Sequence, residues 1–167
     1  MSSIQTEEIK TRIDVEKFEK AKKEAEDCYK NIQEIYCPYF KEKIAFNAKG
    51  WEHIKFKGRW KARSRHDQYI RLRLISLASQ IIHDSHTLQG LYETHGFEHE
   101  KRNKRWDKIL RKITYYEFIA VIKRSRVRII VKQVEDEPKY FWSIIPFWKM
   151  DSMTSKRVIH SGRPEID

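Results

Sequence analysis

The chain has 167 residues, a length that suits one domain with a hydrophobic core better than two ordinary domains. Lysine and arginine total 35 against 24 aspartates and glutamates, and the formal net charge is +11. An excess of this size repels itself, so a polyanionic partner is its natural explanation. Apolar residues make up 40% and aromatic residues 13% of the chain, which excludes a disordered protein.

Membrane association and disulfide chemistry are not expected. No apolar stretch reaches the roughly 20 residues that span a bilayer, and the first residues lack the apolar segment of a signal peptide. The two cysteines, Cys28 and Cys37, are too few for a disulfide framework and lack the spacing of a metal-binding pair. We therefore expect a cytoplasmic protein with reduced thiols.

The first half of the chain is predicted to be mainly helical. Apolar residues at helical spacing predict a long amphipathic helix over residues 9–35, which Pro38 terminates. Alternating apolar residues predict a short strand over residues 43–47, followed by a turn of helix at residues 51–53. Asp67 is predicted to cap a second helix that ends near His83 and supplies much of the core.

Two basic segments interrupt this pattern. The first has no strong periodicity and is expected to form a loop or a charged rim; its cations are Lys55, Lys57, Arg59, Lys61, Arg63 and Arg65. Residues 87–111 are ambiguous, because Leu88, Leu91 and Tyr92 can form another short helix before a second basic block at residues 101–105.

The last third changes to β-branched and aromatic residues. Three such runs, residues 115–123, 127–134 and 139–148, are separated by short charged breaks that suit hairpins. The predicted fold class is therefore α+β, with helices packed on one face of an antiparallel β-meander. We divide the chain into an accessory helix (1–36), an α+β domain (37–149) and a polar tail (150–167), with one domain overall.

Four stretches carry a resemblance to a known superfamily: FNAKGWEHI, RHDQYIRLRLISLA, YYEFIAVIKRSRVRIIVKQV and KYFWSIIPFW. Over residues 37–148 their order resembles the phage-associated nucleases of the barnase, EndoU, colicin and RelE-like ribonuclease superfamily. The resemblance implies a barnase/RelE-like fold whose sheet face holds RNA. It also implies cleavage without metal or cofactor, in which the ribose 2′-hydroxyl attacks to give a 2′,3′-cyclic phosphate. The pieces that match best are His53 and, in the last strand, Ser143.

Cleavage of this kind needs a base, an acid and cations around the developing phosphorane charge. His53 is the candidate acid or base, because imidazole titrates near neutral pH; a helix-end histidine bonded to a carbonyl is the structural alternative. Arg63, Arg65 and Arg71 can clamp phosphate oxygens through their guanidinium groups.

Polar residues on the predicted strands supply the remaining catalytic candidates. Lys132 and Ser143 each interrupt an apolar run, which suggests a site where Lys132 stabilises the transition state and Ser143 orients the phosphate. An edge-strand lysine and a core serine are the alternatives. Glu117 can act as a barnase-like general base, or it can simply pair with Arg128 across the strands.

Histidines at 83, 86, 95 and 99 form two pairs, but their spacing fits no known zinc motif, so we expect no metal site. Nucleic-acid contacts are expected from basic and aromatic residues, because RNA binding combines phosphate contacts with base stacking. They are Lys55, Lys57, Arg59, Lys61, Arg65, Arg71, Arg102, Arg105, Trp60 and Trp148.

The leading functional hypothesis is a metal-independent endoribonuclease, a toxin or phage-derived effector that acts on tRNA, messenger RNA or ribosome-associated RNA. The alternative is a non-catalytic RNA- or DNA-binding protein that uses the same basic face. A third reading is an interaction protein whose first helix pairs with an antitoxin, an immunity protein or a second copy of itself.

Overall fold

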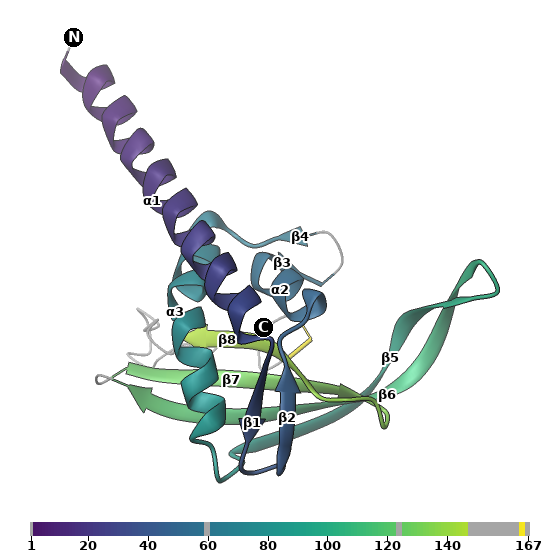
Figure 1. Cartoon of the computed structure of the whole chain (residues 1–167). Helices are drawn as coiled ribbons and strands as arrows, with labels where there is room; N and C mark the ends of the chain where they lie inside the picture. Colours follow the sequence, from purple (N-terminus) through teal and green to yellow (C-terminus); the bar gives the residue numbers. More distant parts are fainter. Residues whose placement is uncertain (1, 59–60, 123–124, 147–163, 166–167) are drawn as a thin grey trace, which may run out of the picture.

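A mostly antiparallel sheet and helices packed against it form the protein, an α+β fold (Figure 1). The computed structural model describes residues 2–58, 61–122, 125–146 and 164–165. The helices are α1 (Ser2–Ile32), α2 (Ala48–Lys55) and α3 (Arg65–His83). The strands are β1 (Glu34–Cys37), β2 (Glu42–Ala45), β3 (Phe56–Lys57), β4 (Lys61–Ala62), β5 (Gly90–Arg102), β6 (Arg105–Ile122), β7 (Ser125–Val134) and β8 (Tyr140–Pro146).

The main sheet has the strand order β1-β2-β8-β7-β6-β5. Strands β5 to β8 form an antiparallel meander, in which each strand pairs with the next along the chain. The predicted meander is therefore confirmed. The β1–β2 hairpin joins it through a parallel contact between Ala45 and Tyr140, which brings the N-terminal half of the chain beside β8.

Helix α3 supplies the centre of the core. Its apolar stripe includes Ile75, Ala78 and Ile82, which are fully buried in one cluster with Phe118 and Phe141 of the sheet. Helix α1 packs against α3, and its C-terminal half joins the same cluster. Figure 1 shows the N-terminal part of α1 extending beyond the rest of the molecule. None of the helices in the described residues has both the length and the apolar character needed to cross a bilayer.

The predicted C-terminal end of the first helix and the predicted cap of the second helix need correction. Helix α1 ends at Ile32, because Gln33 has a φ of +56° and Ile35 pairs with Ile44 in the β1–β2 hairpin. Apolar spacing at residue 35 suits a helix or a strand, and strand pairing decides between them. Asp67 does not cap α3; the cap is Ser64, whose Oγ accepts a hydrogen bond from the Asp67 backbone nitrogen at 3.1 Å.

The helix predicted around Leu88–Tyr92 is wrong, because this region enters β5. Strand β5 pairs with β6 through a two-residue turn, Asn103-Lys104, in which both residues have positive φ, as a tight hairpin requires. Strand β6 pairs with β7 only from Ile113 onward. Residues 95–112 therefore extend beyond the other strands (Figure 1); we call them the β5–β6 arm.

The first basic run lies on the small β3–β4 hairpin and the segment leading into α3. Lys57, Lys61 and Arg65 are exposed, whereas Arg63 is buried. Arg59 and Trp60 lie outside the described residues, as do Trp148 and nearly all of the predicted polar tail.

Candidate active site

An extra residue in β8 creates the centre of the site. Ile130 of β7 pairs with Ser143, and the next residue, Val131, pairs with Phe141. Trp142 therefore has no partner in this ladder and forms a β-bulge, a feature that re-aims side chains and is common beside active sites. The indole of Trp142 donates a hydrogen bond from Nε1 to the Pro164 carbonyl at 2.8 Å.

A cavity of about 650 Å³ lies where α2, the base of the β5–β6 arm and β6 to β8 meet. Its polar and aromatic wall comprises Lys49, Glu52, His53, Phe56, Phe97, Glu98, His99, Tyr115, Lys132, Trp142 and Glu165. The structure thus brings together two of the predicted catalytic residues, His53 and Lys132, from α2 and β7.

Lys132 is a buried cation on this wall, with 5% of its surface exposed. Its Nζ lies 2.9 Å from Glu98 Oε1 and 4.3 Å from the centre of the Trp142 ring. Burial lowers the pKa of Lys132, and the hydrogen bond that it donates to Glu98 opposes this effect. An ammonium group in these surroundings is weakly hydrated and gives up its proton more readily than a surface lysine.

His53 lies at the back of the cavity, 4% exposed, with its ring stacked on Trp142 at a centroid distance of 4.0 Å. Its Nε2 lies 3.1 Å from Nη2 of Arg63. A guanidinium only donates, so Nε2 accepts and the neutral ring carries its proton on Nδ1. Burial lowers the pKa of His53 to about 2, and the positive charges of Arg63, Arg71 and Lys132 add to the effect.

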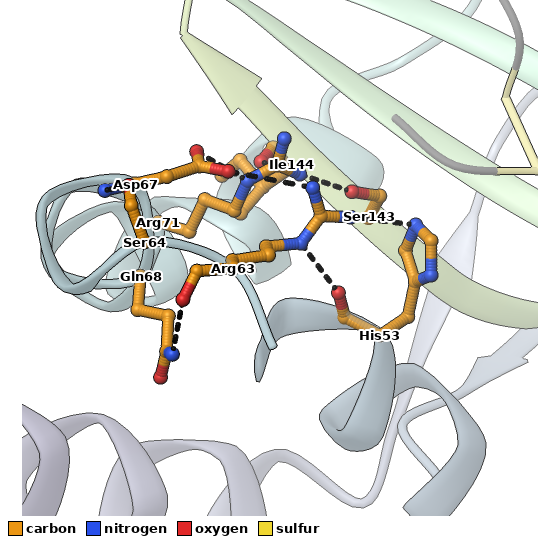
Figure 2. Close-up of polar contacts among 8 residues, drawn as sticks. All are labelled: His53, Arg63, Ser64, Asp67, Gln68, Arg71, Ser143 and Ile144. Atoms are coloured by element: carbon orange, nitrogen blue, oxygen red, sulfur yellow. Dashed lines mark hydrogen bonds and ion pairs between the residues drawn. The ribbon is translucent and has the colours of Figure 1, made fainter. Parts of the chain in front are cut away.

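Behind His53, two buried guanidinium groups share the carboxylate of Asp67 (Figure 2). Arg63 donates from Nε to the His53 carbonyl at 3.0 Å and lies 3.4 Å from Asp67. Arg71 donates from Nε to Asp67 at 2.9 Å and from Nη1 to Ser143 Oγ at 2.7 Å. This network ties α2, α3 and β8 together.

The network changes the expected positions of three candidates. Arg63 and Arg71 direct their guanidinium groups into the protein, and a phosphate contact would require them to leave these partners. Ser143 is fully buried, and its hydroxyl accepts from Arg71. Of the predicted arginine clamp, Arg65 is exposed, with its guanidinium 5.6 Å from the ring centre of Phe18.

Glu117 faces a separate, smaller cavity of about 130 Å³. Its Oε2 lies 2.8 Å from Nη2 of Arg128, the cross-strand pair considered in the sequence. Glu117 is therefore not among the residues that line the larger cavity with His53 and Lys132, although Tyr115 borders both spaces.

The other predicted contacts divide by location. Lys55 is partly covered and pairs with Glu52 at 3.1 Å, whereas Lys57 and Lys61 are exposed on the β3–β4 hairpin. Arg102 and Arg105 are exposed and pair with each other in the strand register beside the arm's turn. In the described part of the chain, no three histidine, cysteine or acidic side chains are grouped as a metal would require.

The sequence analysis did not identify Glu98, Tyr115 or Trp142 as cavity residues. The available signal was in the strand pairing: Tyr115 lies opposite Lys132, so the two share a sheet face. That register could not be read until the strands were paired.

Comparisons of the chain with protein-family models, with curated proteins and with solved structures found no match.

Proposed function

We propose that this protein is a metal-independent endoribonuclease with a barnase/RelE-like fold, active in the cytoplasm. In this proposal the ribose 2′-hydroxyl loses its proton and its oxygen bonds to the adjacent phosphorus. The bond from phosphorus to the 5′-oxygen breaks and that oxygen takes up a proton, so the products carry 2′,3′-cyclic phosphate and 5′-hydroxyl ends. The observation that supports it is the buried Lys132 ammonium, which lies beside Trp142 and His53 in one cavity. A cavity of about 650 Å³ falls within the size range of ligand sites.

Lys132 is assigned the stabilisation of the phosphorane. Negative charge grows on the phosphate oxygens in the transition state, and a cation in a poorly hydrated site stabilises this charge more strongly than a cation in water. The lowered pKa of Lys132 also suits it to donate a proton to the leaving 5′-oxygen.

His53 is assigned a positioning role in this scheme. Its Nε2 lone pair already accepts from Arg63, and its ring stacks on Trp142. Proton transfer through Nε2 would require the Arg63 contact to open, so the geometry favours holding Trp142 over exchanging protons. The hydrogen bond from Arg71 to Ser143 likewise holds β8 against α3.

The test is incubation of the purified protein with total cellular RNA in EDTA, with analysis of the fragment ends. Wild type is expected to leave cyclic-phosphate and 5′-hydroxyl ends. Lys132→Met, which keeps the length of the side chain and removes its charge, is expected to lose about 100-fold or more in rate. Lys43→Met is the matched control, because Lys43 is an exposed lysine of β2 paired with Glu34. Intact RNA with wild type, or equal rates for both variants, contradicts the proposal.

A second variant separates chemistry from folding. Glu98→Gln removes the charge that raises the pKa of Lys132, so the lysine is expected to lose its proton at a lower pH. If protonated Lys132 is the active form, the alkaline limb of the kcat/KM profile moves to lower pH in this variant. A limb that stays in place would show that Lys132 is not the titrating group.

The second candidate function is a non-catalytic RNA- or DNA-binding protein. The buried contacts of His53, Arg63 and Arg71 favour it, since these residues then serve the fold and leave the exposed cations to bind phosphate. Salt-sensitive binding of RNA without cleavage distinguishes it from the nuclease. If the nuclease is a toxin or phage-derived effector, tRNA, messenger or ribosome-associated RNA is the expected substrate, and an antitoxin or immunity protein is the expected inhibitor.

A further inference from the structure

The β5–β6 arm has two chemically different faces. Residues that pair across the strands share a face, so Phe97 lies with Leu110, His99 with Lys108, and Lys101 with Trp106. We call these six residues the lysine–aromatic face. The arm's three carboxylates all lie on the opposite face: Glu98, Glu100 and Asp107.

The lysine–aromatic face is open to solvent along its whole length. Phe97 is 60% exposed, Trp106 69% and Leu110 55%, and the three polar members are exposed as well. On the opposite face, Glu98, Glu100 and Ile109 are partly covered. Large apolar side chains gathered on one exposed surface usually mark a site of interaction.

Charge and shape together point to the ligand. The lysine–aromatic face presents cations and flat rings with no carboxylate among them, and Lys108 Nζ lies 5.2 Å from the centre of the Phe97 ring. From residue 97 to residue 102 the strand extends about 17 Å at ~3.3 Å per residue. Proteins bind single strands with this combination, because lysines contact the phosphates while unpaired bases stack on aromatic rings.

The arm also adjoins the cavity. Phe97 and His99 belong to the lysine–aromatic face and line the cavity that holds Lys132. Glu98, between them in the chain, bonds Lys132 directly. By the strand alternation Glu98 and Lys132 lie on one face and the lysine–aromatic face lies on the other, so a strand whose phosphate lies at Lys132 reaches the arm by passing around the edge strand β5.

We propose that the lysine–aromatic face binds unpaired RNA that flanks the segment held in the cavity, with bases stacked on Phe97 and Trp106 and phosphates on Lys101 and Lys108. The choice of RNA as the ligand rests on the proposed function. The binding surface itself rests on the exposure and charge of the arm. The arm thus directs the protein toward single-stranded stretches and away from duplexes, whose bases are already stacked on one another.

The experiment measures binding separately from cleavage. A fluorescent single strand of about 16 nucleotides carries 2′-O-methyl riboses, which lack the nucleophile, and its duplex serves as the second ligand. Phe97→Ala/Trp106→Ala is expected to weaken binding of the single strand by about tenfold to hundredfold and to change duplex binding less. Lys101→Gln/Lys108→Gln is expected to reduce the slope of log K against log salt by about 1.4, for two lost phosphate contacts.

The matched control is Tyr36→Ala/Lys43→Gln, an exposed aromatic and an exposed lysine on the β1–β2 hairpin at the other edge of the sheet. It is expected to bind like wild type. Arm variants that bind the single strand as tightly as the control overturn the proposal. Equal losses of affinity for the single strand and the duplex in the arm variants overturn the assignment to unpaired RNA. If the arm variants lose self-association of the protein but keep their RNA affinity, the face binds a second copy of the chain instead.

Failure of the arm and failure of the nuclease give different results. If cellular RNA is cleaved but the arm variants bind normally, the nuclease stands and the arm inference falls. If cellular RNA stays intact while the arm variants lose affinity for the methylated strand, the arm inference stands and the nuclease falls.

Discussion

The buried imidazole of His53 predicts that acid destabilises the protein through one identified residue. Folding lowers the pKa of His53 from 6.5 to about 2, because burial and the charge of Arg63 disfavour the imidazolium. Below pH 6.5 the unfolded chain therefore binds a proton that the folded chain does not bind. Stability rises with pH wherever the unfolded state holds more protons, so it falls as the pH drops from 6.5 toward 2.

The size of the effect follows from the two pKa values. Each pH unit below 6.5 costs about 1.4 kcal/mol for one such group, so lowering the pH from 7.5 to 5.0 removes about 2 kcal/mol. Because the folded pKa lies well below 5, only the pKa in the unfolded chain determines this figure. It is a large fraction of the ~5–15 kcal/mol that stabilises a typical domain.

The assay is urea denaturation at pH 7.5 and pH 5.0 for wild type and His53→Gln. Glutamine does not titrate, and it offers an amide oxygen to Arg63 in place of Nε2. Carboxylates elsewhere contribute to both proteins equally, so the difference between the two pH losses isolates His53. Wild type is expected to lose about 2 kcal/mol more than the variant. Equal losses would refute the assignment, as would an NMR signal for a proton on Nε2 of the folded protein.

The remaining predictions concern packing, the buried network and Glu117. Gly50→Ala is expected to cost about 3 kcal/mol in urea denaturation, since its Cβ would lie 2.1 Å from the Phe141 carbonyl oxygen; a cost near zero contradicts the close approach of α2 to β8. Ser143→Ala is expected to cost about 1–3 kcal/mol by removing the acceptor 2.7 Å from Arg71 Nη1, whereas an unchanged midpoint would mean that this contact is dispensable. Glu117→Gln is expected to leave RNA cleavage within about twofold, and a 100-fold loss would return Glu117 to the candidate bases.

Much of the fold could be predicted because its signals are local. The apolar stripe of α3 and the β-branched runs of β7 and β8 each keep a constant pattern within the element. Each pattern therefore predicts whether its segment is a helix or a strand. The arm failed as a prediction because both of its faces are polar or exposed. Apolar and polar residues do not alternate regularly along β5, so the sequence does not mark it as a strand. Residues 90–102 form a strand because they pair with β6.

The candidate site shows the same division. A charged or polar residue inside an apolar run is conspicuous in any strand, and this is how Lys132 and Ser143 were found from the residues alone. Their surroundings in the folded chain differ, because distant elements pack against each of them. Lys132 faces the cavity, while Ser143 bonds Arg71 in the interior.

The sequence by itself determined the α+β class, the meander, the helix at His53 and the polar interruptions of the strands, because each depends on residues close together in the chain. Tertiary structure alone decided that Arg63 is buried in a run of otherwise similar cations, and that Glu98 of β5 reaches Lys132 of β7. The physical reason is that a side chain's exposure and charge partners depend on which distant element packs against it. Strand register and helix packing settle that only when the whole chain has folded.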